Sequence, residues 1–292
     1  MATIIDGKKI SAEIRLEVRQ EADELKARGI EPHLAVVIVG SDPASQVYVR
    51  NKHQACQEAG IKSTVIELPE DTTQEQLLAQ VERLNDDQGV HGILVQSPVP
   101  QGLSEDKAFE SIHPLKDVDC FHPENVGLLM LGRPRFLPAT PAGVMELLVR
   151  CNIKISGQHV VIVGRSNIVG KPLANMLSQK SERGNATVTV CHTGTRDLPQ
   201  YTRQADIVIA AAGVPGLITG EMLRGNSTVI DVGTNRIPDA AKKSGYRLVG
   251  DVDFESACRV AAYISPVPGG VGLMTVAMLL KNCLRAARLQ AT

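Results

Sequence analysis

Val160-Val161-Ile162-Val163-Gly164-Arg165-Ser166-Asn167-Ile168-Val169-Gly170-Lys171-Pro172 is the stretch that decides the fold. Its four apolar, β-branched residues predict a buried strand of a parallel sheet. Gly164 ends this strand in a turn, and Gly170 and Pro172 open a segment with apolar residues at helical spacing. A strand, a glycine turn and a helix together direct free backbone N–H groups and the positive end of a helix dipole at a phosphate.

The spacing of this stretch departs from the two common phosphate-binding motifs. Arg165-Ser166 stands where G-x-G-x-x-G has its second glycine. Five residues, rather than the four of a P-loop, separate Gly164 from Gly170, and Pro172 replaces the Ser/Thr that would hold magnesium. The stretch alone therefore leaves two interpretations open, a phosphate cradle and a purely structural glycine turn.

The following strand, predicted over Thr187–Cys191, bears on the cofactor. A NAD site usually has Asp or Glu near the end of this strand, where it accepts from the ribose hydroxyls. Here the segment His192-Thr193-Gly194-Thr195-Arg196 has no acid, and Arg165, Thr193 and Arg196 offer donors instead. Donors suit the 2′-phosphate of NADP, so we predict a preference for NADP over NAD.

The bulk composition is that of an ordinary globular protein. The chain has 292 residues, 43% hydrophobic and 22% charged, enough for two domains or one large one. A net charge of −1 argues against a nucleic-acid partner. The N-terminus lacks the apolar core of a signal peptide, and the apolar runs around 207–212 and 271–280 are too short to span a bilayer. We therefore expect no membrane association and a cytoplasmic location.

The cysteines and histidines show no metal-ligand spacing. The six cysteines lack C-x-x-C, and the seven histidines lack H-E-x-x-H. We expect reduced thiols, as in a cytosolic protein, and no metal site.

The N-terminal half alternates between strands and helices, which predicts a parallel α/β domain. The expected strands are Thr3–Ile5, Leu34–Val39, Thr64–Leu68 and Val90–Gln96. A helix is expected over Tyr48–Ala59, after a turn at 41–43, and Thr73-x-x-Gln76 forms a capping box for another. The segment Ser97–Pro141 is rich in Pro, Asp and His and is expected to form loops that line a cleft.

The C-terminal half predicts a Rossmann-like domain. Further strands are expected over Asp206–Ala211, Thr228–Val232, Leu248–Val252 and Ala262–Ile264, with Gly213, Gly216 and Gly233 at or just past strand ends. The loop Ser265–Gly272 has two prolines and three glycines, and an apolar helix over Val271–Leu289 follows it. We expect this helix to return to the first domain. The predicted domains are therefore 1–140 plus 271–292, and 141–270.

Several polar residues could carry chemistry, although each also has an ordinary structural explanation. Tyr48 and Lys52 are four residues apart and share a helix face, yet most such residues are surface or packing groups. Gln96 ends a strand, and Asp117 and Asp119 lie in a loop where aspartates commonly form turns. Tyr-x-x-x-Lys also occurs in short-chain dehydrogenases, but there the glycine turn precedes it.

Taken in order, the motifs resemble one family nearly end to end. They are Tyr48-Val49-Arg50-Asn51-Lys52, Val95-Gln96-Ser97-Pro98-Val99-Pro100, Lys116-Asp117-Val118-Asp119, Thr140-Pro141-Ala142-Gly143, the stretch from Gly164 to Pro172, and Pro266-Val267-Pro268-Gly269-Gly270-Val271-Gly272. Their order resembles the bifunctional methylenetetrahydrofolate dehydrogenase/methenyltetrahydrofolate cyclohydrolase family.

The resemblance implies two α/β domains with the active site in a cleft between them, and a homodimer. It also implies a place in one-carbon metabolism and purine biosynthesis. The first reaction passes a hydride from methylenetetrahydrofolate to NADP. The second adds water to the resulting methenyl cation and yields 10-formyltetrahydrofolate.

The resemblance also assigns roles to individual residues. It makes Lys52 the general acid/base, lets Tyr48 position the folate, brings Gln96 into contact with Lys52 and has Asp119 bind the pterin. The expected cofactor-binding residues are Gly164, Arg165, Ser166, Gly170, Thr193, Gly213 and Gly233. The expected substrate-binding residues are Tyr48, Lys52, Gln96 and Asp119, together with Pro268, Gly269 and Gly272.

The chemistry of the residues agrees with these roles. A lysine can take a proton from water only if its pKa falls towards neutrality, which desolvation brings about. A carboxylate at Asp119 matches the N–H donors of a pterin edge.

Four positions depart from the family pattern: Ser97, Cys120, Ala139 and Leu273 stand where Leu, Gly, Cys and Pro are common. The other functions considered are a dehydrogenase without the cyclohydrolase step, a shikimate-type NADP oxidoreductase and a catalytically silent nucleotide-binding module. The presence of both Lys52 and Gln96 argues against the first. The Lys-Asp-Val-Asp and Pro-Val-Pro-Gly-Gly-Val-Gly motifs argue against the second.

Overall fold

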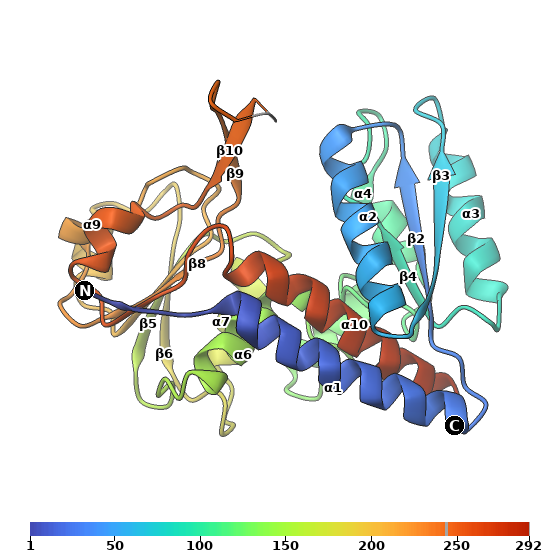
Figure 1. The fold of residues 1–292 in the computed structure, drawn as a ribbon, viewed down its shortest axis with the longest axis horizontal. Helices are drawn as coiled ribbons and strands as arrows, with labels where there is room; N and C mark the ends of the chain where they lie inside the picture. The colour runs from blue at the N-terminus through green and yellow to red at the C-terminus, as the bar shows by residue number, and fades with distance from the viewer. Residues whose placement is uncertain (243–244, 292) are drawn as a thin grey trace. The chain divides into compact units, whose positions relative to one another are not determined.

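The computed structural model describes residues 1–242 and 245–291 and has the predicted α/β fold, with parallel sheets and surrounding helices (Figure 1). The chain forms two compact units. The three-stranded unit comprises Ala12–Ala139 and Val276–Thr292, and the six-stranded unit comprises Met1–Ser11 and Thr140–Thr275. Two of the three divisions fall inside long helices, α1 (Gly7–Ala27) and α10 (Val271–Gln290), and the third lies between Ala139 and Thr140. The domain boundaries expected from the sequence stay a prediction. The compact units differ from them because residues 1–11 group with the six-stranded unit.

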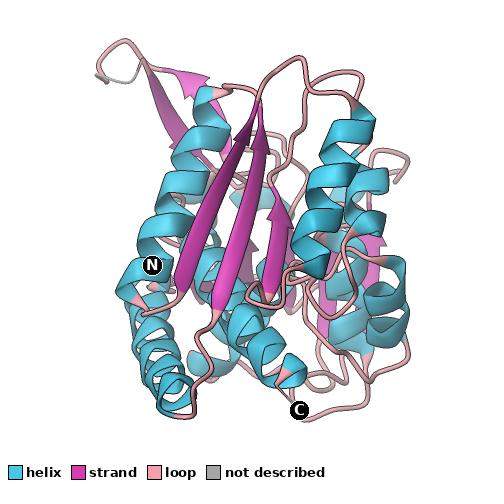
Figure 2. Ribbon diagram, turned by 90° about the vertical axis from the view of Figure 1, so that its right-hand side faces the viewer, coloured by secondary structure: helices cyan, strands magenta, loops and turns pink. Residues whose placement is uncertain are grey.

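The three-stranded unit is built on one parallel sheet with helices on its two sides (Figure 2). The strand order is β3 (Lys62–Leu68), β2 (His33–Val39), β4 (Gly92–Val95). The helices are α2 (Pro43–Glu58), α3 (Gln74–Asp86), α4 (Glu105–Ser111) and α5 (Pro123–Met130). All seven residues of the central β2 are buried, as expected of a strand covered on both faces.

Helix starts in this unit follow the capping rules. The side chain of Asp42 accepts a hydrogen bond from the backbone N–H of Ser45, so α2 begins at Pro43, earlier than the sequence indicated. The capping box at Thr73 and Gln76 is confirmed, with both reciprocal hydrogen bonds present.

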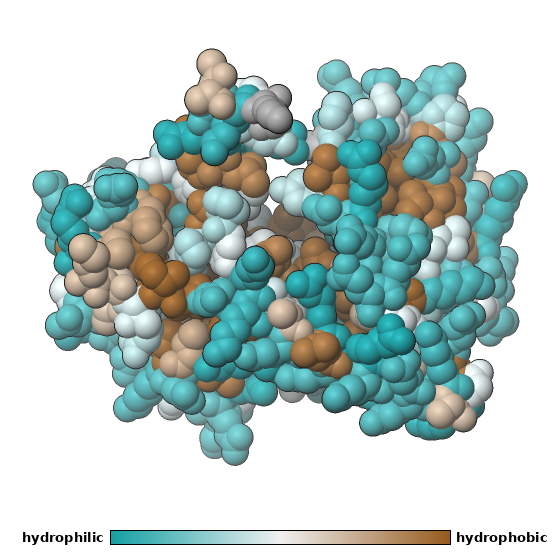
Figure 3. Space-filling model, viewed as in Figure 1, coloured by the Kyte–Doolittle hydropathy of each residue, from teal (hydrophilic) through white to brown (hydrophobic). Residues whose placement is uncertain are grey.

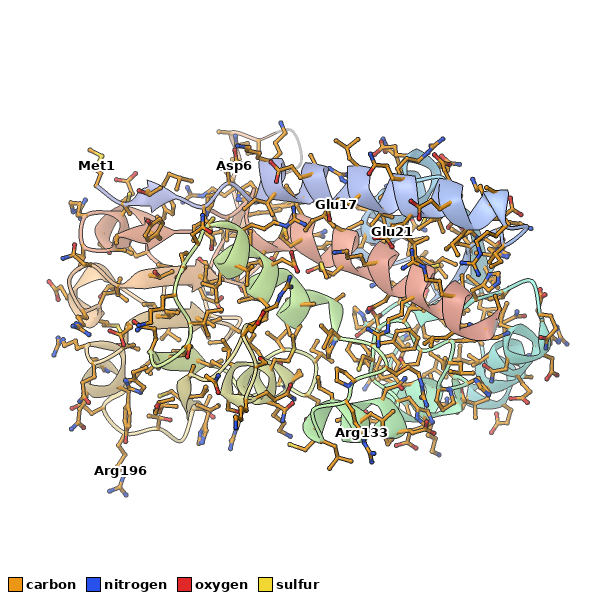
Figure 4. All side chains as sticks on the ribbon, turned by 90° about the horizontal axis from the view of Figure 1, so that it is seen from below. Met1, Asp6, Glu17, Glu21, Arg133 and Arg196 are labelled. Atoms are coloured by element: carbon orange, nitrogen blue, oxygen red, sulfur yellow. The ribbon has the colours of Figure 1, made fainter. Side chains whose placement is uncertain are left out.

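Within the three-stranded unit, α10 pairs with α1 and reaches the loops beside the sheet. Figure 4 labels Glu17 and Glu21 on α1, which pair with Lys281 and Arg288 of α10. The side-chain amide of Asn282 donates to the carbonyl oxygens of two loop residues at 2.7 Å each, Val118 and Leu137. The face of α1 seen in Figure 3 is mainly hydrophilic, as its many charged residues require.

The six-stranded unit contains a parallel sheet of the doubly wound type. Its strand order is β1 (Thr3–Ile4), β11 (Tyr263–Ile264), β8 (Thr228–Asp231), β7 (Ile207–Ala210), β5 (His159–Val163), β6 (Thr187–Cys191). The helical segments are α6 (Ala139–Arg150), α7 (Gly170–Ser178), α8 (Leu198–Thr202), α9 (Phe254–Cys258) and the short 3-10 helix η1 (Gly220–Met222). The order of the strands reverses at β5, which has β6 on one side and β7 on the other, all three being parallel.

A two-stranded hairpin adds to this unit and was not expected from the sequence. β9 (Asn235–Pro238) pairs antiparallel with β10 (Tyr246–Val249), where the sequence indicated only one strand, over 248–252. Alternate residues of β9 are exposed, so it lacks the apolar run that marks the buried strands. The guanidinium of Arg236 stacks on the ring of Tyr246, 4.7 Å from its centroid.

Candidate functional site

The Lys52 amine and the Gln96 amide lie together in the three-stranded unit. Lys52 is on α2, which follows β2, and Gln96 comes directly after β4, so both lie near the carboxyl ends of neighbouring parallel strands. The Nζ of Lys52 donates to Oε1 of Gln96 at 3.0 Å. The Nε2 of Gln96 donates to the carbonyl oxygen of Ser97 at 2.6 Å, which fixes the amide so that its oxygen faces the amine.

Burial shifts the pKa of Lys52 and that of the neighbouring Asp119. Burial lowers the pKa of Lys52, and the nearby Asp119 carboxylate opposes this by favouring the ammonium. Burial also raises the pKa of Asp119 to about 6, against a downward effect of Lys52 and a further upward effect of Asp117. Lys52 and Asp119 therefore act on each other's charge, and the sequence placed both among the candidate residues.

The thiol of Cys56 lies one helical turn beyond Lys52. It is fully buried, and burial raises its pKa to about 12. The thiol therefore remains protonated near neutral pH.

Lys116 and Asp117 have structural roles that the sequence did not distinguish from functional ones. The amine of Lys116 donates to three carbonyl oxygens at the end of α3, those of Leu84, Asn85 and Asp87, at 2.7–2.9 Å. The Asp117 carboxylate accepts from the backbone N–H groups of the two residues Phe121 and His122 and from the amide of Asn125. Both groups use their hydrogen bonds within the fold.

Tyr48 lies on α2, one turn before Lys52, and 43% of it is exposed. Its exposure leaves the ring available to a ligand, and its assignment as a folate-positioning residue stays a prediction.

Two of the departures from the family pattern have structural explanations. The Ser97 hydroxyl donates to Oε1 of Glu105 at 2.6 Å, a bond that leucine cannot make, and the Val99 N–H donates to the same oxygen. Cys120 has φ 62°, a left-handed conformation that explains why glycine suits this position. Its thiol donates to the carbonyl oxygen of Phe136. Nothing in the structure explains Ala139, which is buried, or Leu273, which is exposed.

In the six-stranded unit, the turn after β5 has the close packing of a phosphate-binding turn. Gly164 has φ +134°, and a Cβ there would clash with the carbonyl oxygen of Ala211. A Cβ on Gly170 would clash with the carbonyl oxygen of Gly164. The Ser166 hydroxyl accepts from the backbone N–H groups of Val169 and Gly170 at the start of α7. The N-cap residue Val169 makes no side-chain cap bond itself, so the Ser166 hydroxyl supplies the cap, and the positive end of the helix dipole lies beside the turn.

Polar donors stand where a 2′-phosphate would be recognised. Arg165 follows β5, and Thr193 and Arg196 follow β6; all three side chains are exposed, and Arg196 extends outward in Figure 4. Residues 192–196 contain no carboxylate that would accept from a ribose hydroxyl. The donor set therefore fits NADP better than NAD.

Two buried carboxylates at the same edge of the sheet, Asp231 and Asp251, were not among the residues selected from the sequence. Asp251 accepts from the backbone N–H groups of Ala212 and Gly213 at 2.6 and 2.8 Å, and Asp231 accepts from the N–H of Gly233. Burial raises the pKa of Asp231 to about 6, although three backbone hydrogen bonds lower it. The sequence could have indicated them by position, because Asp231 ends the strand β8 and Asp251 comes two residues after the strand β10.

The glycine-rich loop before α10 is also in the six-stranded unit. Pro268 and Gly272 are exposed, and Gly269 has φ +108°. The neighbouring Gly270 packs so closely on the loop backbone that a Cβ would clash with the carbonyl oxygen of Pro266. The substrate-binding role of Pro268, Gly269 and Gly272 stays a prediction.

Within residues 1–242 and 245–291, no group of three or more His, Cys, Asp or Glu side chains is arranged to hold a metal ion. None of the helices in this part of the chain combines the length and hydropathy that crossing a membrane requires.

Residues 5–119 match the model of the tetrahydrofolate dehydrogenase/cyclohydrolase catalytic domain, and residues 138–291 match that of the NAD(P)-binding domain of the same family. The chain is 56% identical over 286 residues to the bifunctional protein FolD of Prosthecochloris aestuarii, covering 97% of each chain.

Solved structures agree. The FolD methylenetetrahydrofolate dehydrogenase/cyclohydrolase of Campylobacter jejuni is 51% identical, with a TM-score of 0.93 over 99% of each chain. The enzyme of Trypanosoma brucei, solved with NADP and an inhibitor, is 43% identical with a TM-score of 0.94, covering 99% of this chain and 98% of that one. On these matches, the chain belongs to the tetrahydrofolate dehydrogenase/cyclohydrolase family.

Proposed function

We propose that this chain oxidises 5,10-methylenetetrahydrofolate with NADP and then hydrolyses the methenyl product to 10-formyltetrahydrofolate, with Lys52, Gln96, Asp119 and Tyr48 acting on the folate. Family membership supports both reactions. The observation that carries the residue assignment is the hydrogen bond from Lys52 to Gln96, beside the carboxylate that influences the charge of the lysine.

Lys52 is the base of the hydrolysis. The methenyl bridge is a delocalised cation, so attack by water needs a proton acceptor and little electrophilic help. Neutral Lys52 takes a proton from the water as its oxygen bonds to the methenyl carbon. Cleavage of the bond from that carbon to N5, with protonation of N5, leaves the formyl group on N10, and one proton is released overall. Gln96 accepts from the amine and so orients its lone pair.

Asp119 and Tyr48 hold the folate. An ionised Asp119 offers two acceptor oxygens to the adjacent N–H donors of a pterin, and its position beside Lys52 sets the bound ring near the base. The exposed ring of Tyr48, one turn earlier on the same helix, packs against the ligand.

The residues after β5 and β6 bind the cofactor. When bound, NADP accepts the hydride of the first reaction. The turn between the closely packed Gly164 and Gly170 receives the pyrophosphate, beside the positive end of the α7 dipole. Arg165, Thr193 and Arg196 bind the 2′-phosphate, and Ser166 fixes the turn. The loops at Gly213 and Gly233 border the site.

A dehydrogenase without the hydrolysis is the second function considered. The paired Lys52 and Gln96 disfavour it, because hydride transfer needs mainly the alignment of two rings and no base.

A spectrophotometric assay tests the proposal. Purified protein is supplied with methylenetetrahydrofolate and either NADP or NAD, and methenyl formation and decay are followed. We expect formation followed by decay, with a lower KM for NADP than for NAD. If methenyltetrahydrofolate forms but decays no faster than in a protein-free blank, only the dehydrogenase activity remains. A lower KM for NAD than for NADP would contradict the assignment of Arg165, Thr193 and Arg196 to the 2′-phosphate.

The assembly, location and metabolic role are also proposed. We infer a cytoplasmic homodimer whose 10-formyl product serves one-carbon transfers, including those of purine biosynthesis. The chain's reduced thiols are consistent with the location. Light scattering on the eluted protein tests the dimer, and a mass near 31.3 kDa would contradict it.

A further inference from the structure

We propose that Asp251 is a positioning residue for the nicotinamide half of the dinucleotide, because it fixes the backbone of the loop that follows β7. This inference rests on the proposed NADP binding.

The carboxylate of Asp251 is the shared partner of several segments at one edge of the sheet. Its Oδ2 accepts from the N–H groups of Ala212 and Gly213, directly after β7, at 2.6 and 2.8 Å. Its Oδ1 accepts from the side-chain amide of Asn235, at the start of β9, at 2.8 Å. Its backbone N–H donates to Oδ1 of Asp231, at the end of β8, at 2.9 Å. One residue thus ties the ends of β7 and β8 and the hairpin together.

The arrangement is rigid. Asp251 is completely buried, and Gly213 has the left-handed φ of +68°. Ala211 precedes Ala212, and its carbonyl oxygen packs so closely on Gly164 that Gly164 has no room for a side chain. The loop held by Asp251 therefore contacts the glycine turn that receives the pyrophosphate.

The sequence makes room for the two carboxylates by using glycine beside each. A Cβ on Gly233 would clash with the carboxylate of Asp251, and a Cβ on Gly250 would clash with that of Asp231. The Asp231 N–H in turn donates to the hydroxyl of Ser265, which precedes the proline and glycine loop. A buried pair of acids needs this many donors, because unpaired carboxylates away from water are costly.

The strand order assigns this loop to the nicotinamide half. A dinucleotide crosses a doubly wound sheet at the point where the strand order reverses, with its pyrophosphate at the first glycine turn. Here that point is β5, and the donors for the 2′-phosphate of the adenosine half lie at β5 and β6. The nicotinamide half therefore extends to the other side, over β7 and β8, where Asp251 holds the loop.

The experiment compares two ligands by titration calorimetry on the full chain. NADP spans both halves of the site, whereas 2′,5′-ADP occupies only the adenosine half. In Asp251→Ala, two N–H groups lose their acceptor and the loop is released, so we expect the Kd for NADP to rise at least about tenfold. The Kd for 2′,5′-ADP should stay within about twofold, which also shows that the unit is folded.

Two further variants separate positioning from general stability. Asp251→Asn keeps one oxygen for Ala212 and Gly213, and the Asn235 amide can rotate to accept from the new NH2, so its Kd for NADP should lie within about threefold of wild type. Asn235→Ala keeps the carboxylate but frees its orientation, so NADP binding should weaken by about threefold with 2′,5′-ADP unchanged. This variant carries the test if Asp251→Ala does not fold.

The outcomes distinguish the inference from the function on which it rests. A wild-type chain that binds neither ligand would contradict the proposed NADP binding itself. A wild-type chain that binds both, with variants that bind NADP as tightly as wild type or lose both ligands equally while folded, would overturn the role of Asp251.

Discussion

Replacing Lys52 by methionine separates the role of its amine from the role of its hydrocarbon stem. Methionine keeps an unbranched apolar side chain on the same face of α2, but it cannot donate to Gln96 or take a proton from water. Burial lowers the pKa of the Lys52 amine, so holding it charged in the folded state costs free energy. The methionine variant has no such cost.

The size of the effect follows from the role assigned to the amine. Removing a general base lowers a rate by about 10²–10⁴-fold, so we expect the cyclohydrolase kcat to fall at least about 100-fold, equivalent to about 2.7 kcal/mol in the barrier. Hydride transfer needs no base, so the dehydrogenase should lose less. Gln96 loses one donor but keeps its bond to Ser97, so the melting temperature should remain unchanged or rise.

Lys116→Met is the matched control in the same unit. Burial lowers the pKa of Lys116 too, but its amine is bonded to three carbonyl oxygens at the C-terminal end of α3. Those carbonyls lose a cation that also complements the helix dipole, so the free energy of unfolding should fall by about 1–3 kcal/mol. The cyclohydrolase kcat per folded molecule should not change.

The assay follows the decay of methenyltetrahydrofolate with and without each variant, beside a thermal melt. Lys52→Met should lose activity and keep stability, and Lys116→Met should do the reverse. Full cyclohydrolase turnover in Lys52→Met, or an equal loss of activity in both variants, would refute the reasoning.

Three more predictions concern stability. Asp119 has an ordinary pKa of 3.8 that rises to about 6 on folding, so its stabilising proton is fully effective below pH 4 and is lost as the pH rises through 6. Between pH 5 and pH 7, the free energy of unfolding measured in urea should fall by about 1 kcal/mol more for wild type than for Asp119→Asn. An equal dependence of that free energy on pH in both proteins would exclude this titration. Gly164→Ala should lower the free energy of unfolding by more than about 3 kcal/mol, because its Cβ meets the Ala211 carbonyl, whereas Gly157→Ala, with a positive φ and nothing within 4 Å, should lose only about 1. Cys120→Gly should stay within about 1 kcal/mol of wild type, since relief of its left-handed φ offsets the lost thiol contact, while a β-branched valine there should lose more than about 2; similar melts for both would contradict the strain argument.

The sequence predicted the buried parallel strands well because both faces of such strands are covered. Runs such as 160–163 and 34–39 are continuously apolar, rich in β-branched residues and followed at once by glycine, which together favour a buried strand over a helix segment. The exposed hairpin β9–β10 escaped prediction for the opposite reason, because its residues alternate in burial and include a proline.

The candidate site was predicted only in part, since a residue's type does not show whether its hydrogen bonds are already used. Lys52 and Lys116 are both lysines in motifs of the family. The resemblance predicted the contact of Lys52 with Gln96, whereas only the structure shows that Lys116 binds three carbonyls. Asp251 was overlooked because it binds the backbone N–H groups of Ala212 and Gly213. Nearly every residue has such a group, so the sequence does not show which of them an acid will bind.

The interleaved course of the chain has a consequence for its synthesis. The strand Thr3–Ile4 pairs with Tyr263–Ile264, and the three-stranded unit includes Val276–Thr292. A ribosome that delivers the chain from its amino end must therefore release about 260 residues before the first strand meets its partner. Neither unit can be completed during most of translation, so the nascent chain has apolar strands exposed for longer than one whose domains follow one another, and chaperones that bind such strands should associate with it until its last helix emerges.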